Sequence, residues 1–547
     1  MTVNNTDTFL VERSGTSYKL QAQNLMADLQ DNDLMLVERS GTSYKATGLD
    51  IKNSLGSDEP TFKATASGSI GNGNTVCLNS NGTVSVVSST NVSHSAGSEI
   101  NCENQSSGSS YQDGFDSCMI NATTICVVYN FNGTNCYSRI GTISGSSISF
   151  GTEIYVGYGT RPFVNYNPTV NRLMYITNAR VRCASFSGTT ITLQPSFTWN
   201  SWVVSKECAV YNEADGKVYF AFHWFYANVV RYEVVAAFNF VTSGTPTFGE
   251  SNFNPSGNPH YNSKRGCYDP INEVCVFVFT FQNYAQMQIA SDGGTQPFVS
   301  YRGMIQGTQF GYDTAVAYDP LIKKPVVCWR DNGNNAYFNY INVVQPTNTT
   351  GASTPTVGNQ ITWKTNGKAV NTDMAYDSQS EKVAVAYIDA ASNYRPRITP
   401  VTFSLSGTTL SATVGTAVDT DTRNGYTNIT QGFNRVLPAT AGKVIHFYNH
   451  ASGTANGVYV RLVTMPAVTT NVTATNFVGF ADGSYSNGQE AKVITHLGSA
   501  TTSQSNLTSG NTYYVRKDGS LSTSPFSTTV KAGVATASNA IDINVIP

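Results

Sequence analysis

Short runs of alternating apolar and polar residues fill the middle of the chain, and turn-forming residues separate them. Five segments share one pattern, which is an apolar strand ending in Tyr, a turn with Asn, Asp or Pro, and a second alternating strand. Two weaker copies begin at Met119 and Val436. Alternation with a period of two residues predicts β-strands, so we expect a series of hairpins. The aligned tyrosines, 45 to 58 residues apart, are Tyr166, Tyr211, Tyr268, Tyr318 and Tyr376.

Each segment is followed by a further strand and a turn rich in Gly, Ser and Thr, as in RITPVTFSLSGTTLSA. Three or four strands in about 50 residues, repeated about seven times, predict a β-propeller over residues 105–466. One small sheet cannot bury both of its faces, whereas a ring of such sheets can. A parallel β-helix is the alternative, but its repeat would be shorter and more regular.

A closer repeat opens the chain. The nine residues VERSGTSYK occupy positions 11–19 and again 37–45. Each copy predicts a hairpin that turns at Ser-Gly, followed by a short amphipathic helix in AQNLMADL or GLDIKNSL. Units of this size are too small to enclose a core. Residues 1–56 must therefore pack on each other or on a partner.

The two flanks of the propeller are also related. GNTVCLNSNGTVS at 73–85 matches GNTYYVRKDGSLS at 510–522, with Asn-Gly and Asp-Gly at the same place. These dipeptides are the strongest signals for a two-residue hairpin turn. We therefore expect one small β-module at residues 57–104 and another at 467–547. The predicted fold is all-β, with N-terminal repeats, a module, a propeller and a second module.

Composition narrows the chemistry. Charged residues make up 12% of the chain and the net charge is -2, so no nucleic-acid surface is expected. No apolar run reaches the ~18 residues of a membrane span, and the N-terminal residues show no secretory signal. The ten cysteines include no C-x-x-C pair, so we expect buried, reduced thiols rather than zinc ligands.

No catalytic pattern stands out in the sequence. Glycosidases need two facing carboxylates, but the acids of the propeller mostly lie in turns, where Asp269, Asp319 and Asp377 are expected to cap the backbone. The segment SDGGTQPF from Ser291 approaches a sialidase repeat but lacks its Trp. We therefore predict that the protein is not an enzyme and has no cofactor and no metal site.

Aromatic residues suggest binding instead. All five tryptophans lie between residues 199 and 363, and aromatic faces stack on sugar rings or on protein surfaces. Trp224 and Trp329 are expected to fill space between blades. Trp202 and Tyr394 have polar neighbours and are expected to be exposed. The candidate receptor-binding residues are Trp202, Tyr226, Tyr394 and Arg395.

The pattern D-x-x-L-V-x-R-x-G-T-S-Y-K, followed by a short helix, resembles the N-terminal segment of virion structural proteins of marine tailed bacteriophages, particularly cyanophages. The stretch SGNTYYVRKDGSLSTSP, with KAGVAT after it, is similar to a β-module of phage tail and fibre proteins. The resemblance covers residues 7–55 well, 60–88 and 476–545 moderately, and the propeller hardly at all. It implies a virion protein, made in the host cytoplasm, that docks through its N-terminus and displays its larger domain.

The position on the particle stays open between a tail fibre, another tail part and a head decoration. The doubled repeat suits docking, because two linked contacts raise avidity; the alternative is a spacer. Arg and Tyr are common interface anchors, so the candidate docking residues are Arg13, Tyr18, Lys19, Arg39, Tyr44 and Lys45.

The partners that this reading implies are other virion proteins and a host surface glycan or protein. A homotrimer is the oligomer that the resemblance suggests, because fibre-like phage proteins are commonly trimeric. Neither nucleic acid nor membrane insertion is expected. A purely scaffolding virion protein and a polysaccharide-degrading tailspike are the alternative functions.

Overall fold

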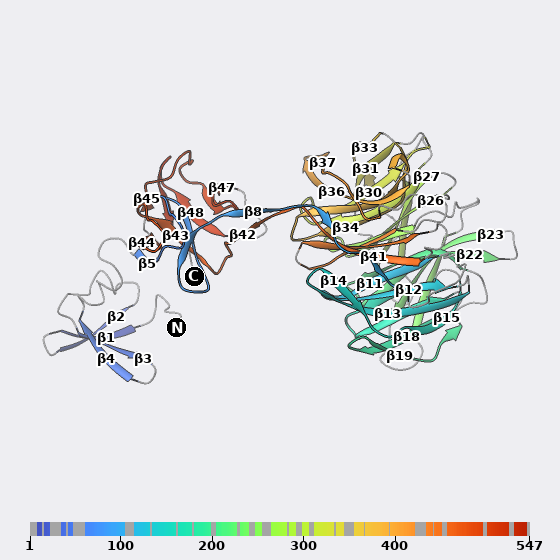
Figure 1. The fold of residues 1–547 in the computed structure, drawn as a ribbon, viewed down its shortest axis with the longest axis horizontal. Helices are drawn as coiled ribbons and strands as arrows, with labels where there is room; N and C mark the ends of the chain where they lie inside the picture. Colours follow the sequence, from blue (N-terminus) through green and yellow to red (C-terminus); the bar gives the residue numbers. More distant parts are fainter. Residues whose placement is uncertain are drawn as a thin grey trace. The chain divides into compact units, whose positions relative to one another are not determined.

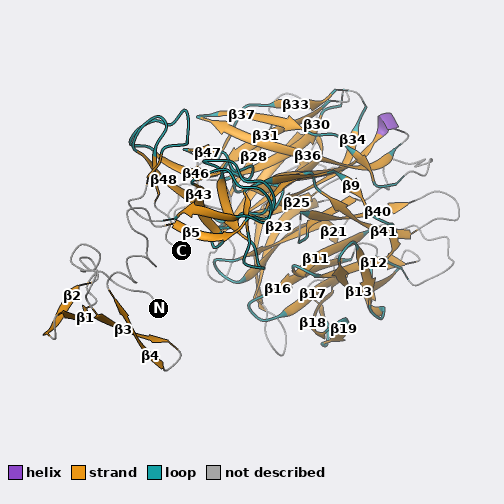
Figure 2. Cartoon of the chain, turned by 60° about the vertical axis from the view of Figure 1, so that its left-hand side comes forward, coloured by secondary structure: helices purple, strands orange, loops and turns teal. Residues whose placement is uncertain are grey.

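The chain is almost entirely β-structure (Figure 1). The computed structural model describes residues 8–13, 16–21, 34–39, 42–47, 61–103, 114–131, 134–159, 162–177, 180–198, 204–226, 230–239, 247–253, 264–281, 284–291, 298–305, 311–332, 335–343, 355–365, 367–392, 394–421, 434–440, 442–450, 457–495, 500–523 and 530–543. In these ranges the only helical element is the 3-10 turn η2 (Ala390–Ser392), visible in Figure 2. No described helix is long and apolar enough to cross a bilayer. The chain divides into two units, Met1–Asn91 with Val468–Pro547, and Val92–Ala467.

The described residues of the unit Val92–Ala467 form seven antiparallel sheets of four or five strands. The first holds β11 (Phe115–Asn121), β12 (Thr124–Phe131), β13 (Asn135–Ser144), β14 (Ser147–Phe150) and β15 (Ile154–Tyr158). The second holds β16 (Phe163–Asn167), β17 (Arg172–Thr177), β18 (Arg180–Ser187), β19 (Thr190–Leu193) and β20 (Phe197–Thr198). The third holds β21 (Val204–Asn212), β22 (Lys217–Tyr226), β23 (Val230–Asn239) and β24 (Thr247–Phe253). The fourth holds β25 (Lys264–Asp269), β26 (Val274–Phe281), β27 (Tyr284–Ser291) and β28 (Phe298–Met304).

The remaining three sheets follow the same plan. The fifth holds β29 (Tyr312–Asp319), β30 (Lys324–Arg330), β31 (Ala336–Asn342), β32 (Thr356–Val357) and β33 (Ile361–Lys364). The sixth holds β34 (Ala369–Asp377), β35 (Lys382–Asp389), β36 (Arg395–Ser406), β37 (Thr409–Val414) and β38 (Val418–Asp419). The last holds β39 (Asn434–Pro438), β40 (Lys443–His450) and β41 (Gly457–Thr464), together with β9 (Ser95–Ala96) and β10 (Ile100–Asn101).

The first strands of these sheets form a closed cycle. They contact one another in the order β11, β16, β21, β25, β29, β34 and β39, and β39 in turn contacts β11. This cyclic arrangement of small sheets is a β-propeller, which confirms the predicted fold. The unit begins at Val92 rather than at residue 105, because β9 and β10 pair with β41 and complete the last sheet.

The repeated Tyr motif forms the turn between the first and second strands of a sheet. The buried residue after each Tyr accepts a hydrogen bond from a backbone N–H two or three positions later; these residues are Asn167, Asn212, Asp269, Asp319 and Asp377. The predicted role of the three aspartates as turn caps is therefore confirmed. Four positions after each cap the backbone is left-handed, with φ between 52° and 69°, at Asn171, Gly216, Glu273, Lys323 and Glu381.

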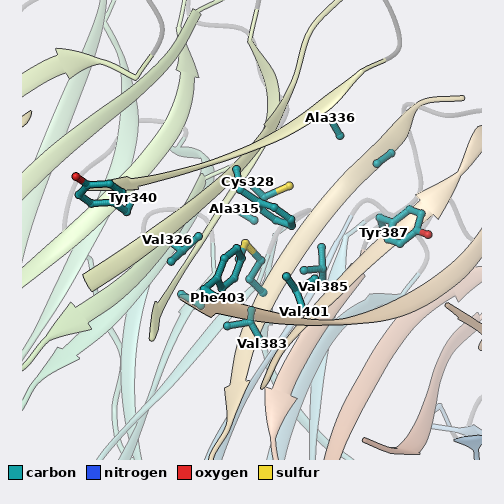
Figure 3. Packing of buried hydrophobic residues seen from close by; sticks show 14 of the residues in the cluster. Ala315, Val326, Cys328, Ala336, Tyr340, Val383, Val385, Tyr387, Val401 and Phe403 are labelled. Carbon is teal, nitrogen blue, oxygen red and sulfur yellow. The ribbon is translucent and has the colours of Figure 1, made fainter. Parts of the chain in front are cut away.

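Apolar side chains fill the space between neighbouring sheets. In the cluster of Figure 3, Val326 and Cys328 of β30 face Val383 and Val385 of β35. Trp329 is fully buried in a similar cluster between the fourth and fifth sheets, as predicted. All ten cysteines are free thiols, and all but one are buried, which matches the expectation.

The N-terminal repeats form one sheet rather than two separate units. Both predicted hairpins are present, and the pairing of Val11 with Met35 and of Glu12 with Leu34 joins them. The strand order is β2-β1-β3-β4, so the two TSYK segments lie in the outer strands. The expected short helices lie outside the described residues. The strands are β1 (Thr8–Arg13), β2 (Thr16–Gln21), β3 (Leu34–Arg39) and β4 (Thr42–Thr47).

The two flanks of the propeller build two copies of one module, but not the copies expected. One sheet has the order β5-β44-β43-β6-β7 and combines residues from both flanks. Its strands are β5 (Thr61–Thr65), β6 (Thr75–Leu78), β7 (Val84–Val86), β43 (Phe477–Ala481) and β44 (Glu490–Ile494). The expected division into modules at 57–104 and 467–547 is therefore wrong, because strands from the two flanks hydrogen-bond to each other.

The second sheet has the corresponding order β45-β49-β48-β46-β47 and is continuous in sequence. Its strands are β45 (Ala500–Thr501), β46 (Thr512–Val515), β47 (Leu521–Ser522), β48 (Lys531–Ala535) and β49 (Ile541–Ile543). We call residues 61–87 with 471–495 the first module and residues 500–543 the second module. In the first module the whole propeller is inserted between β7 and β43. The linking strands β8 (Ser89–Val92) and β42 (Ala467–Thr470) pair with each other.

Equivalent backbone details support the duplication. Gly82 and Gly519 have φ values of 82° and 84° in the two hairpin turns. Asn81 Oδ1 accepts a hydrogen bond from Thr83 N–H at 3.1 Å, and Asp518 Oδ1 accepts one from Ser520 N–H at 3.0 Å. Gly479 and Gly533 are equivalent too, because a Cβ at either would lie 1.9 or 2.0 Å from the facing strand's carbonyl oxygen.

The two modules pack closely on each other. Cys77, Phe477 and Ile494 of the first share one core with Val515, Ala532 and Ile541 of the second. The Thr75 hydroxyl donates to Gly519 O at 2.9 Å, across the joint. A Cβ on Gly519 would lie 2.6 Å from Thr75 Oγ1 and 2.7 Å from Val87 O. The second hairpin is therefore fitted to the first module without room for a side chain at its tip.

Candidate functional site: a charged network at the centre of the propeller

Charged side chains from four innermost strands come together in the propeller. Asp116 belongs to β11, Arg265 to β25, Asp373 to β34 and Arg435 to β39. Arg265 Nε lies 2.8 Å from Asp373 Oδ1. Arg435 Nε lies 3.4 Å from Asp116 Oδ1, and its Nη1 lies 3.6 Å from Asp373 Oδ2. We call these four residues the central network; it joins sheets that are not neighbours, since β29 lies between β25 and β34 in the ring.

An irregular strand places Asp373 of the central network. The pairing of β34 shifts between Val370 and Asp373, where Asn371 has a φ of 52°. Such a bulge bends a strand and redirects the next side chain. The strand β29 has a similar shift beside Asp313, whose φ is 51°. The Asp313 carboxylate pairs with Arg330 at 2.5 Å.

The carboxylates of the central network also accept backbone hydrogen bonds. Val164 N–H donates to Asp116 Oδ2 at 3.2 Å, and Val436 N–H donates to Asp373 Oδ2 at 2.8 Å. Each donor belongs to the next inner strand around the ring, which is β16 after β11 and β39 after β34. The network therefore ties neighbouring sheets together as well as distant ones.

The charges of the central network balance. Burial raises the pKa of the Asp116 carboxyl above its usual value, although Arg435 and two backbone N–H groups oppose this shift. Burial favours a lower pKa for the Arg435 guanidinium, but attraction by Asp373 and Asp116 outweighs it, and the net shift of its pKa is upward. Buried charges are tolerated when they are paired and hydrogen-bonded. The two arginines and two aspartates form a neutral ion-pair network, in which each carboxylate already has both kinds of partner.

A buried histidine extends the polar contacts. His446 is fully buried, with Nε2 at 3.0 Å from Asn434 Oδ1 and Nδ1 at 2.8 Å from Thr420 Oγ1. The backbone carbonyl oxygen of Asn434 in turn accepts a hydrogen bond from Arg265 Nη2 at 2.8 Å. Burial, and then the nearby Arg461, lower the pKa of the His446 imidazole to about 3. The ring is therefore neutral at physiological pH.

The candidate docking residues lie on the N-terminal sheet. Arg13 ends β1 and Arg39 ends β3. Tyr18 and Lys19 belong to the outer strand β2, and their counterparts in the repeat belong to the outer strand β4. The strands bring the two copies into one sheet, while the side chains of Arg13, Tyr18, Lys19, Arg39, Tyr44 and Lys45 lie outside the described part of the structure.

The candidate receptor-binding residues are not brought into one described site. Trp202 lies outside the described residues, as does the side chain of Tyr226 at the end of β22. Tyr394 is half-buried rather than exposed, and it lies in the turn before β36 with a φ of 57°. The Arg395 guanidinium is paired with the Asp419 carboxylate at 3.2 Å.

Sequence reasoning did not identify the central network. A signal was present, because Arg265 and Asp373 each stand three positions before an aligned Tyr. A charge at the same inward position in two repeats indicates a shared buried contact. The distant pairing of Arg435 with Asp116 has no such signal, since only the closure of the ring brings β39 beside β11.

Comparison with known proteins gives structural similarity alone. No family model and no curated protein matches the chain. A protein from Lactobacillus plantarum matches with a TM-score of 0.38 and 11% identity, over 55% of this chain and 83% of that one. The WD40 domain of Toxoplasma gondii coronin matches with a TM-score of 0.39 and 10% identity, over 72% of this chain and 89% of that one. A Bacteroides fragilis protein provisionally described as a 6-phosphogluconolactonase matches with a TM-score of 0.39 and 9% identity, over 56% of this chain and 84% of that one.

Proposed function

We propose that this protein is a structural component of a tailed-phage particle, which docks through its N-terminal repeats and displays the propeller for binding to a host surface. The observation that carries the display part is the insertion of the whole propeller between β7 and β43 of the first module. Its two linking strands, β8 and β42, pair side by side. A domain inserted in this way is presented by its carrier without interrupting the carrier's own sheet.

The docking part rests on the phage-like sequence pattern and on the N-terminal sheet. Two copies of VERSGTSYK form one sheet whose outer strands, β2 and β4, both contain TSYK. Outer strands carry backbone groups that can pair with another chain. The sheet therefore offers two chemically matching edges, which suits bivalent attachment to repeated sites on a particle or to further copies of this chain.

We infer that the propeller binds rather than catalyses. Both carboxylates of the central network are held by arginines and by backbone N–H groups. A general base or nucleophile needs an available lone pair within reach of a substrate. The recurring aspartates Asp269, Asp319 and Asp377 are likewise used by their turns.

Incorporation into particles tests the proposal. Tagged full-length protein and a variant lacking residues 1–56 are produced during infection, and both are quantified in purified virions. The proposal expects the full chain in virions and the shortened chain in the soluble fraction, with the same propeller melting temperature. Equal incorporation of the full chain and the shortened chain would mean that the repeats are only a spacer. Absence of the full chain from every virion would refute the virion assignment itself.

Adsorption of the purified chain to host cells, with a parallel assay for release of reducing sugars, tests the display part. The expected result is adsorption without sugar release. Sugar release would favour the tailspike alternative, and incorporation without adsorption would favour a scaffold.

A further inference from the structure

Two tyrosines on the rim of the propeller are unusually exposed. Tyr155 and Tyr158 belong to β15, an outer strand of the first propeller sheet. Their exposed fractions are 46% and 57%. Among the large hydrophobic side chains of the described part of the chain that are exposed, these two are the only aromatic ones. Exposed aromatic side chains that lie close together commonly mark a binding surface.

A β-bulge places both tyrosines on one face of the sheet. Tyr155 pairs with Tyr137 of β13, and Tyr158 pairs with Asn135. Residues three apart in a regular strand lie on opposite faces. Here the register shifts by one residue at Val156, so the two tyrosines share the face of Tyr137 and Asn135. Val156 itself is buried on the other face. Bulges that redirect a side chain in this way are frequent at functional sites.

Close packing fixes the bulge. Gly157 is buried, and a Cβ at this position would lie 2.3 Å from Thr177 Oγ1 in the neighbouring sheet. At the end of the strand, Gly159 N–H donates to Thr134 O at 2.7 Å. The backbone that carries the two tyrosines is therefore held from both sides, and their positions are preorganised.

The described side chains opposite the tyrosines in β13 are aromatic or neutral and polar. The ring of Tyr155 lies 5.7 Å from that of Tyr137, edge to face at 68°. Tyr137 in turn contacts Phe131 at 6.3 Å. Tyr155 and Tyr158 pair with residues two apart in β13, so they stand about 7 Å from each other along the strand. This gives two rings in a row, the first supported by Tyr137 and the second opposite Asn135.

Two charged residues of the described chain near the tyrosines, Glu153 and Arg139, are already engaged. The Glu153 carboxylate accepts a hydrogen bond from the Tyr129 hydroxyl. Arg139 donates to Gly151 O at 2.8 Å and to Cys102 O at 3.0 Å, and its guanidinium lies over the Phe150 ring. Among the residues that the structure describes, ring faces, hydroxyl groups and an amide remain for a ligand. A neutral, polyhydroxylated molecule with apolar ring faces matches this chemistry.

We propose that Tyr155, supported by Tyr137, and Tyr158, opposite Asn135, form a binding platform for a neutral oligosaccharide. This inference rests on the proposed role of the propeller in binding a host surface, and it names the ligand class and the place. Stacking of one sugar on each tyrosine ring provides the affinity, and Asn135 orients the oligosaccharide.

The test compares three forms of the full chain. They are the wild type, the double variant Tyr155→Ala/Tyr158→Ala, and a matched control, Ile271→Ala/Leu321→Ala, which removes exposed apolar side chains from turns of other sheets. Each is titrated against a panel of neutral and acidic oligosaccharides. The wild type is expected to bind neutral members, the tyrosine variant at least ten-fold more weakly, and the control within two-fold. Tyr155→Phe/Tyr158→Phe keeps the rings and should retain most of the affinity.

Binding restricted to acidic members, no binding to the panel, or equal affinity of the wild type and the tyrosine variant would overturn the platform. Melting temperatures of the wild type, the two alanine variants and the phenylalanine variant verify folding. Adsorption to host cells is measured on the same samples. If the wild type and the tyrosine variant adsorb equally, the proposed receptor function stands and the platform falls. If the wild type adsorbs to no cell, the receptor function itself falls.

Discussion

Removal of the Asp373 carboxylate should weaken the whole propeller. Asp373 is almost fully buried and pairs with Arg265 at 2.8 Å and with Arg435 at 3.6 Å. It also accepts the Val436 N–H at 2.8 Å. In Asp373→Ala the two arginines keep only one carboxylate of the network between them, Asp116, and a buried N–H loses its acceptor.

The magnitude follows from these losses. Breaking a buried ion pair by removing one partner costs about 3–5 kcal/mol, and an unsatisfied buried N–H costs about 1–3 kcal/mol. The total loss is smaller than the sum of the two costs, because the arginines are still partly exposed and can reach water. We therefore expect a total of about 4 kcal/mol. An unfolding entropy of about 2 cal/mol/K per residue converts this to a decrease in melting temperature of about 5 °C for a propeller of this length.

Calorimetry on the full chain measures this decrease, since the propeller and the modules are separate units. Arg395→Ala is the matched control, because its pair with Asp419 is more exposed, at 27% and 22%, and should contribute about 1 kcal/mol or less. A melting temperature for Asp373→Ala within 1 °C of the Arg395→Ala value would refute the reasoning that the central network holds the ring together.

Three further predictions concern other parts of the chain. Acidification below pH 6.5 should lower the stability of the wild-type propeller by about 1 kcal/mol per pH unit, because the native pKa of His446, about 3, lies below its unfolded value and the unfolded state takes up a proton first. His446→Gln should flatten this loss. Urea unfolding between pH 5 and 7 measures this, and an unchanged slope in the variant would contradict it. The double variant Glu273→Gly/Lys323→Gly should stabilise the propeller by about 1 kcal/mol, because both residues have left-handed backbones that glycine adopts more easily. Gly216→Ala should destabilise the propeller by about 1 kcal/mol for the same reason. Urea midpoints that move in the opposite directions would exclude backbone strain as the cause. Gly519→Ala should destabilise the modules by about 3 kcal/mol, because its Cβ meets Thr75 and Val87, while Gly82→Ala, with open space at the tip, should cost about 1 kcal/mol. Equal losses in thermal unfolding of the two variants would mean that the joint between the modules tolerates a side chain.

The sequence predicted the elements that depend on local patterns. The Tyr-Asp turns, the two hairpins of the N-terminal repeat and the hairpins at Asn81-Gly82 and Asp518-Gly519 all occur where expected. Each depends on residues within a few positions of one another, so composition and spacing suffice.

The features that sequence reasoning missed depend on distant pairing. The strands β6 and β43 are almost 400 residues apart in the chain, yet they hydrogen-bond in one sheet. No local pattern indicates that Phe477 lies opposite Cys77. The same is true of Arg435 and Asp116, and of Tyr155 and Tyr158, which only a one-residue bulge places on a common face.

The insertion between β7 and β43 also has an evolutionary consequence. The incoming and outgoing strands β8 and β42 lie next to each other, so any domain whose termini are adjacent could replace the propeller as a cassette. The carrier would keep its sheet, its hairpins and its N-terminal repeats. The second module has the equivalent position between β47 and β48, where only a short connection stands. Exchange at either position would alter what is displayed in a single recombination event, and selection could act on specificity and on attachment independently.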